Sequence, residues 1–314
     1  MTHTLTTPTL PRRLTIPLLL PMLLLLVALS GCAGGASPQA VTTPVEASEP
    51  TVATPATATD TPAAAAADTS AEERSASTAD LLLARVGINA EFEPFVYKDE
   101  AGQVVGFDID LLTALAKAGN FEVTYVDLPF EQLLAQVETG ELDAAISAIT
   151  VTDERAEQVS FSDSYFQSGK APVSYFNPGQ GLAVRNDETT IASADNLTSQ
   201  TKVGVKADTT GAQFVATETD AEAIVYPEAA NAFAALRNGD VDAVVIDIPV
   251  IVRYITNNSD AGIRITGGPL TDELYAIAVS PARDDLLTRI NAALAQIQSD
   301  GTYDQLFEKW FGSP

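Results

Sequence analysis

A turn pattern that occurs twice in the chain constrains its fold most strongly. In "LLAQVETGELDAAIS" and "AFAALRNGDVDAVVID" an amphipathic helical stretch ends at a glycine, Gly140 or Gly239. Asp-Ala follows at 143–144 and 242–243, and then a short apolar run typical of a buried strand. A glycine that ends a helix before a strand is common in α/β proteins, so chance similarity is one interpretation. The equal spacing favours the other interpretation, two lobes of similar construction.

Strand-like and helix-like stretches alternate along the chain from Leu81 onward. Such alternation predicts mostly parallel sheets covered by helices, and ligands of open parallel sheets bind beyond the carboxyl ends of the strands. Those ends are Ser147 and Asp247, so both residues line one cleft if the lobes face each other. The expected strands are 83–88, 121–126, 143–147, 202–206, 223–226 and 242–246, and the expected helices are 107–120, 130–140, 211–218, 228–239 and 248–258.

The N-terminus is typical of an export signal rather than of the fold. Arg12 and Arg13 precede a short apolar run that is interrupted by prolines and ends in "LSGC". This ending resembles the lipobox of bacterial lipoproteins, which predicts a signal peptide over residues 1–31 and a lipidated Cys32. A plain secretory signal with a chance cysteine is the alternative. Residues 32–80 are rich in Ala, Thr and Pro and predict a disordered tether.

Composition excludes several classes of function. The only histidine, His3, lies in the predicted signal, and Cys32 is the only cysteine. The mature chain therefore has no residues for Ser-His-Asp or Cys-His catalysis, for a His or Cys metal site or for thiol redox chemistry. Loss of Arg12 and Arg13 takes the net charge from −25 to −27. So acidic a surface argues against nucleic acid and against binding to anionic lipid other than through the lipid anchor.

Two charged residues suggest binding chemistry from their surroundings alone. Arg155 is adjacent to Asp153 and Glu154, but neighbours on a helix do not face one another, so neither acid is an obvious partner. Asp247 follows the apolar run "DAVVI", where a carboxylate needs a cation or hydrogen-bond donors. The alternative interpretations are a surface charge for Arg155 and a helix N-cap for Asp247.

Four separated blocks of the sequence resemble the type II periplasmic substrate-binding proteins. The blocks are "RVGINAEFEPFVYKDEAGQVVGFDIDLLTALAK", "DAAISAITVTDERAEQVSFSDSYF", "DAVVIDIP" and "GTYDQLFEKWFG". They fit best the polar amino acid branch that feeds ABC importers. The resemblance implies two similar three-layer α/β lobes joined by a two-crossing hinge. The first lobe would comprise residues 81–180 and 271–314, and the second lobe residues 181–270.

The resemblance also implies the residues of a ligand site. The arginine of "TVTDER", Arg155, would bind the carboxylate of a free amino acid through its planar fork, and Asp247 would bind the ammonium. The N-terminus of the helix at Thr209 and Thr210 also favours an anion. The remaining positions expected to contact the ligand are Thr150, Ser147 and Ala148 for its backbone groups, Phe92 and Phe130 as aromatic walls, and Asn89 and Lys206 for its side chain.

The resemblance further implies a partner and a mechanism. The ligand would bridge two lobes that close by hinge motion about crossings near "GQGLAVR" and "GGPLTDELYAIAV". The closed, monomeric receptor would then dock on an ABC permease, with no cofactor, no metal and no catalysis. Lys206 and the absence of an acid at Asn89 favour a polar neutral or acidic amino acid over a basic one, unless Glu91 or Glu93 turns inward. The rival hypotheses are a dehydratase-like enzyme on the same scaffold and an amino acid sensor without a permease.

One segment departs from the pattern of this family. "SYFQSGKAPV" is followed by "SYFNPGQGLAV", which resembles a ten-residue tandem duplication near residues 164–180, at the first crossing. A harmless longer loop is one interpretation, because loops tolerate insertions. An altered hinge or an additional contact surface is the other.

Overall fold

The computed structural model describes residues 81–167 and 177–312 of the chain. The predicted signal peptide, Cys32, the predicted tether and most of the tandem repeat lie outside the described residues. Among the described residues no helix is both long and apolar enough to cross a membrane.

The first of two five-stranded sheets has the strand order β5-β1-β6-β15-β7. Strand β1 runs parallel to its neighbours β5 and β6, and β15 runs antiparallel to β6 and β7. Strand β15 comes from the C-terminal part of the chain, so the lobe is built from two separate segments. The strands are β1 (Leu82–Ile88), β5 (Phe121–Asp127), β6 (Ala144–Ala145), β7 (Ser160–Phe161) and β15 (Ala278–Val279).

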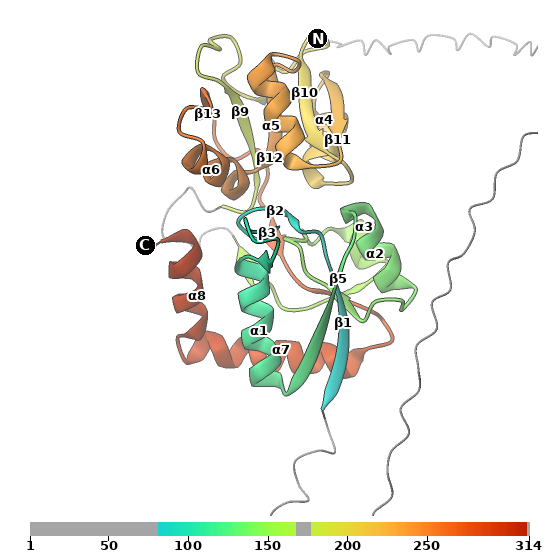
Figure 1. Ribbon diagram of the computed structural model, residues 1–314. Coiled ribbons are helices and arrows are strands. Elements are labelled where there is room, and N and C mark those ends of the chain that lie inside the picture. Colours follow the sequence, from blue (N-terminus) through green and yellow to red (C-terminus); the bar gives the residue numbers. More distant parts are fainter. Residues whose placement is uncertain (1–80, 168–176, 313–314) are drawn as a thin grey trace, which may run out of the picture. The chain divides into compact units, whose positions relative to one another are not determined.

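Helices cover both faces of this first sheet (Figure 1). On one face Leu111, Leu112 and Leu115 of α1 pack into the same core as Ile146 and residues of α7. On the other face the apolar side of α2 packs against the opposite side of β6 and β15. The helices of this lobe are α1 (Phe107–Gly119), α2 (Phe130–Glu138), the short α3 (Asp153–Ala156), α7 (Asp284–Ser299) and α8 (Thr302–Phe311).

The second sheet has the order β11-β10-β12-β9-β13, with β10 parallel to β11 and β12. Val203 and Val245 pack with Val215 of α4 on one face, whereas Val244 packs with Phe233 of α5 on the other. The strands are β9 (Gln180–Arg185), β10 (Lys202–Lys206), β11 (Glu222–Tyr226), β12 (Ala243–Asp247) and β13 (Ile263–Thr266). The helices are α4 (Thr210–Glu218), α5 (Ala229–Asn238), α6 (Ile248–Asn257) and the 3-10 helix η2 (Ala194–Asn196).

Two smaller sheets complete the structure. The first is a meander, made of β2 (Glu91–Phe92), β3 (Val96–Lys98) and β4 (Val104–Val105), which leads into α1. In the second, β8 (Phe166–Gln167) pairs antiparallel with β14 (Leu274–Tyr275). These last two strands lie on the segments that connect the two large sheets.

The predicted α/β sheets covered by helices are confirmed, but each sheet is mixed rather than mostly parallel, because β15 and β7 in the first sheet and β9 and β13 in the second add antiparallel pairs. Both copies of the repeated turn share a left-handed glycine. Gly140 and Gly239 follow α2 and α5 with left-handed φ angles of 76° and 80°, which favour glycine. One difference from the prediction concerns the strand expected over 143–147, which is limited to Ala144–Ala145. Three residues beyond the end of this strand, Ala148 adopts a left-handed φ of 49°.

Candidate functional site

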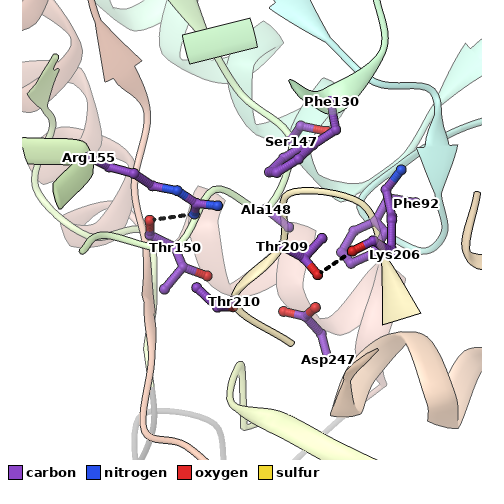
Figure 2. Close-up of a pocket in the computed structure, with 10 residues that line it drawn as sticks. All are labelled: Phe92, Phe130, Ser147, Ala148, Thr150, Arg155, Lys206, Thr209, Thr210 and Asp247. Carbon is purple, nitrogen blue, oxygen red and sulfur yellow. Dashed lines mark hydrogen bonds between the residues drawn. The ribbon is translucent and has the colours of Figure 1, made fainter. Parts of the chain in front are cut away.

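Ten of the eleven residues expected to contact a ligand line a single pocket, with an empty volume of about 280 Å³. Side chains from both lobes line the pocket (Figure 2). On one side they come from α3 and from the loop that follows β6, and on the other side from the ends of β10 and β12. The lining residues are Phe92, Phe130, Ser147, Ala148, Thr150, Arg155, Lys206, Thr209, Thr210 and Asp247.

Arg155 extends its guanidinium into one side of the pocket (Figure 2). It lies on α3, whose N-cap residue Thr152 accepts the Arg155 N–H at 3.2 Å. One Nη donates to the Thr150 carbonyl at 2.9 Å and the other to the Asp208 carbonyl at 3.1 Å. Within the described residues no carboxylate lies within 4.0 Å of this guanidinium. Arg155 is therefore not the paired surface charge of the alternative interpretation, and it retains N–H donors for an anion.

Burial lowers the pKa of Arg155, and the negative charges of Glu273 and Asp247 oppose that effect. Because an arginine remains protonated at any physiological pH, the residue is a permanent cation in a pocket that restricts water. A carboxylate bound here would gain two charge-assisted hydrogen bonds.

Backbone groups around the arginine also suit an anion. The isolated bridge between Thr150 and Tyr275 is formed by the N–H groups of Val151 and Ala276, so it does not use the Thr150 N–H. Across the pocket, Thr209 is the N-cap of α4, and its hydroxyl accepts the Ala212 N–H at 3.2 Å. The N-terminus of this nine-residue helix carries a partial positive charge.

Asp247 provides the opposite charge from the end of β12. Its side chain is only 4% exposed and, although the residue occupies the N-cap position of α6, it makes no capping hydrogen bond. The hydroxyl of Tyr275 donates to its carboxylate. Burial and the neighbouring negative charge of Glu273 raise the pKa of Asp247 to about 7, against the hydrogen bond from Tyr275. A bound cation would stabilise the ionised form of this carboxylate.

Aromatic and cationic side chains form the remaining wall (Figure 2). The ring of Phe130 lies between two cations, with its centroid 5.6 Å from the Arg155 guanidinium carbon and 5.9 Å from Lys206 Nζ. Lys206 is 2% exposed and donates to the Pro227 carbonyl at 2.8 Å. Burial lowers the pKa of Lys206, while Glu91, among other acids, opposes this.

The loop after β6 is fixed from beneath by a buried carboxylate. Asp108 in the first turn of α1 is fully buried and accepts the Ala148 N–H at 2.8 Å. This bond holds Ala148 in its left-handed conformation, and burial raises the pKa of Asp108 to about 7. The Ser147 hydroxyl accepts the Asn89 N–H at 3.3 Å, so it is also engaged within the protein.

Asn89 is the one predicted contact residue that the structure does not bring into this pocket. Its side-chain amide donates to the Leu128 carbonyl at 3.0 Å, and the residue lines a separate hollow together with Glu91. Glu93 also points elsewhere: it pairs with Arg253 of α6 at 2.8 Å and accepts a hydrogen bond from Asn257 at 3.0 Å. These two contacts join the meander of the first lobe to the second lobe.

Three buried residues beside the pocket are not identified by the sequence patterns. Glu273 and Tyr275 lie on the second connecting segment, and Gln180 lies at the start of β9. The stretches around them, "GGPLTDELYAIAV" and "GQGLAVR", predict only connecting strands. A buried acid within the otherwise apolar run "ELYAIAV" is the signal that identifies Glu273 as a candidate.

The described residues contain no cluster of three or more His, Cys, Asp or Glu side chains arranged for a metal ion. With the cation Arg155 and the carboxylate Asp247 in its lining, the pocket suits the binding of a small molecule that carries both an anionic and a cationic group.

Two three-layer lobes with a charged pocket between them define the class of type II, two-lobed binding proteins. Residues 84–313 match the bacterial extracellular solute-binding proteins, family 3, and the chain belongs to this family.

Individual relatives agree with this membership. The chain is 33% identical over 231 residues to a probable histidine-binding protein of Neisseria gonorrhoeae, covering 72% of this chain and 82% of the relative. It is 31% identical over 229 residues to an ABC transporter glutamine-binding protein of Bacillus subtilis, covering 71% and 79%. Among solved structures, an ancestral arginine-binding protein bound to arginine is 38% identical with a TM-score of 0.67, covering 73% of this chain and 98% of that one. All three are named as binding proteins.

Proposed function

We propose that this protein is a receptor that captures a free L-amino acid between its two lobes. The observation that carries the proposal is the placement of Arg155 and Asp247, which have opposite charges and no ion-pair partner within the described residues, in the same small pocket. An amino acid brings a carboxylate for the first residue and an ammonium for the second, so both buried charges are compensated at once.

The lobes of this receptor comprise residues 81–180 with 271–314, and residues 181–270. In support, the first large sheet draws its strands from residues 82–161 and 278–279, and the second from residues 180–266. Binding stabilises the closed form only by the difference in the ligand's affinity for the closed and open forms.

The side chain of the amino acid lies toward Phe92, Phe130 and Lys206 in this proposal. The relatives are named for histidine, glutamine and arginine, so they give no support to a preference for polar neutral or acidic ligands over basic ones. Two features of the pocket remain in favour of that preference: the buried ammonium of Lys206 and the absence of an acid other than Asp247 among the lining residues.

The receptor is anchored by lipid at Cys32, extends from the membrane on residues 33–80 and delivers its ligand to an ABC permease. The lipobox-like "LSGC" and the names of the relatives support this part of the proposal. Replacing Cys32 with Ser is expected to abolish incorporation of radiolabelled palmitate and to release the protein from the membrane fraction. An unchanged membrane fraction contradicts the anchor without affecting the binding proposal.

The amino acid proposal is tested by thermal-shift screening of the full-length protein against the twenty amino acids, followed by Arg155→Ala. At least one amino acid is expected to raise the melting temperature of the parent, and Arg155→Ala is expected to remove the shift. Arg237→Ala is the matched control, because Arg237 is an exposed arginine of α5 outside the pocket. A parent that responds to none of the twenty, or an Arg155→Ala variant that responds like the control, contradicts the proposal.

A further inference from the structure

Glu273 is a buried carboxylate whose hydrogen bonds come from both lobes. It is 6% exposed and lies on the second connecting segment, immediately before β14. Four side chains donate to it. The hydroxyls of Thr150 and Thr210 donate to Oε2, at 2.6 and 3.2 Å. The hydroxyl of Thr271 and the amide of Gln180 donate to Oε1, at 2.8 and 3.2 Å.

The two donors to Oε2 belong to opposite lobes. Thr150 follows β6 in the first lobe, and Thr210 is the first residue of α4 in the second. Gln180 adds a further link, because its side-chain amide also donates to the Thr210 hydroxyl at 3.1 Å. A single carboxylate oxygen on the connecting segment therefore holds both walls of the pocket beside Arg155.

Neutral donors rather than a cation hold Glu273 in place. Within residues 81–167 and 177–312 no lysine or arginine lies within 4.0 Å of its carboxylate. Arg155 interacts with it electrostatically from farther away and donates directly to the Thr150 carbonyl. A buried anion that depends on a few hydrogen bonds is sensitive to the loss of any one of them.

The geometry points to Glu273 as a positioning residue that ties Thr150 and Thr210 together and so stabilises the closed arrangement of the two lobes. Both threonines turn their hydroxyls toward Glu273, which fixes the backbone of each beside the guanidinium of Arg155. When the lobes separate, Thr210 moves away from Thr150, and one of the two bonds to Oε2 is lost. This inference rests on the proposed function, because the closed arrangement is the one that encloses the amino acid.

Dissociation kinetics test the inference with an amino acid that stabilises the parent in the screen. Glu273→Gln and Thr210→Val are each expected to raise the dissociation rate constant about tenfold, which corresponds to one hydrogen bond to a charged group. The association rate constant should change much less, since the contact forms on closure. The double variant is expected to dissociate no faster than the faster single variant, because both changes break the same contact.

Thr271→Val is the matched control. Thr271 donates to the same carboxylate, but it lies on the same connecting segment as Glu273 and outside the pocket. This variant is expected to lower the melting temperature while leaving the dissociation rate constant within about twofold of the parent. Thr210→Ser, which retains the hydroxyl, is expected to restore slow dissociation.

A distance measurement on the ligand-free protein tests whether Glu273 holds the two lobes together. Full-length protein with Cys32→Ser has no thiol, so spin labels at Gln132→Cys and Gln200→Cys, both exposed and one on each lobe, report the lobe separation by pulsed electron paramagnetic resonance. Glu273→Gln is expected to shift the distribution toward longer distances than in the parent.

The outcomes separate the two proposals. A parent that binds none of the twenty amino acids defeats the proposed function, and the ligand-free distances still decide the role of Glu273. An unchanged distance distribution overturns the role of Glu273, and so does a Thr271→Val variant that dissociates as fast as Thr210→Val. Multiplicative effects of Glu273→Gln and Thr210→Val on dissociation also overturn it, because independent effects exclude a shared contact.

Discussion

The two lobes build the turn between helix and strand in the same way. In the first lobe, the backbone N–H of Asp143 donates to the Arg85 carbonyl at 2.9 Å, and its carboxylate accepts the Arg85 N–H at 2.7 Å. In the second lobe, Asp242 makes the same two bonds to Lys202, at 2.8 and 2.9 Å. The aspartate of the repeated pattern thus binds the backbone of the neighbouring parallel strand in both lobes, within β1 at Arg85 and at the start of β10 at Lys202.

The lobes differ in the path that the chain takes after the strand. The first lobe leaves its sheet after Ala145 and forms a loop, with Ala148 in a left-handed conformation, that leads to Thr150 and Arg155. The second lobe continues from Asp247 directly into α6. Similar scaffolds therefore present a cation on one side and a carboxylate on the other. The repeated turn therefore specifies the sheet, whereas the few residues after the strand specify the charge that each lobe contributes to the pocket.

The largest expected effect comes from removing the charge that only the second lobe supplies. Asp247→Asn keeps the shape of the side chain but removes the carboxylate that we propose to bind the ligand's ammonium. We expect the affinity for the amino acid to fall by about 100-fold or more, as for loss of a buried charge pair. Isothermal titration calorimetry measures the change. Asp242→Asn, in the same lobe but outside the pocket, serves as the control, and equal losses in the two variants would contradict the assignment.

The helix-to-strand turns of both lobes could be predicted from the sequence, because the residues that determine each turn are close together in the chain. Gly140 and Gly239 end amphipathic helices, and the apolar runs after Asp143 and Asp242 form strands, because each pattern lies within a short stretch of chain. The tendency of ligands to bind at the carboxyl ends of parallel strands then placed Asp247 and the loop after β6 at one cleft. The family resemblance supplied the other lining residues.

The parts that were missed depend on contacts between distant segments. Thr150 and Glu273 are 123 residues apart, and no periodicity in either segment indicates that they meet. The Asn89 amide likewise donates to the carbonyl of Leu128, which is 39 residues away, and a ligand contact of Asn89 stays a prediction. The signal peptide, the lipidated cysteine and the tandem repeat remain predictions.

The next largest effect concerns the turn that both lobes share. We expect Asp143→Asn and Asp242→Asn each to lower the free energy of unfolding by about 1 kcal/mol, because the backbone N–H of Arg85 or Lys202 loses a charged acceptor. Asp143→Asn should cost more, since its carboxylate pairs closely with Arg283 and is 22% exposed, whereas that of Asp242 lies 4.0 Å from Arg185 and is 40% exposed. Urea denaturation measures both. The opposite order would indicate that the two turns are not equivalent in structure.

The pH dependence of binding is expected to report the buried carboxylate of the second lobe. Because the pKa of Asp247 is raised to about 7, the ligand-free pocket holds a proton below that pH and must release it to bind an ammonium. Affinity should therefore rise about tenfold per pH unit up to about pH 7 and level off above it. Calorimetric titrations between about pH 5.5 and 8.5 measure this, and Asp247→Asn should show no such slope.

The raised pKa of Asp247 affects stability in the opposite direction: the free energy of unfolding of the ligand-free protein falls as pH rises. The unfolded chain releases this proton near its ordinary value of 3.8, whereas the folded protein retains it until about pH 7. The contribution of Asp247 to the free energy of unfolding thus decreases as pH rises from about 4 to 7, by a few kcal/mol at most. Asp247→Asn should be more stable than the parent at about pH 8 without ligand. A variant less stable than the parent at this pH would contradict the claim that burial destabilises the ionised carboxylate of Asp247.

The smallest expected effect is at the N-terminus of α4. Thr209→Ala removes the N-cap hydroxyl that accepts the Ala212 N–H, and we expect a loss of about 1 kcal/mol in the free energy of unfolding. Thermal denaturation of the ligand-free protein measures it. Thr209→Ser retains the cap and should restore the parent stability, whereas an equal loss in both variants would assign the effect to the lost methyl group.

The most direct test of the central claim uses one amino acid from the screen together with its α-amide and its N-acetyl derivative. The parent is expected to bind each derivative about 100-fold more weakly than the free amino acid, since each lacks one of the two charges. Arg155→Ala should bind the amide as well as the free amino acid, and Asp247→Asn should do the same for the N-acetyl derivative. A parent that binds either derivative as tightly as the free amino acid would contradict the account.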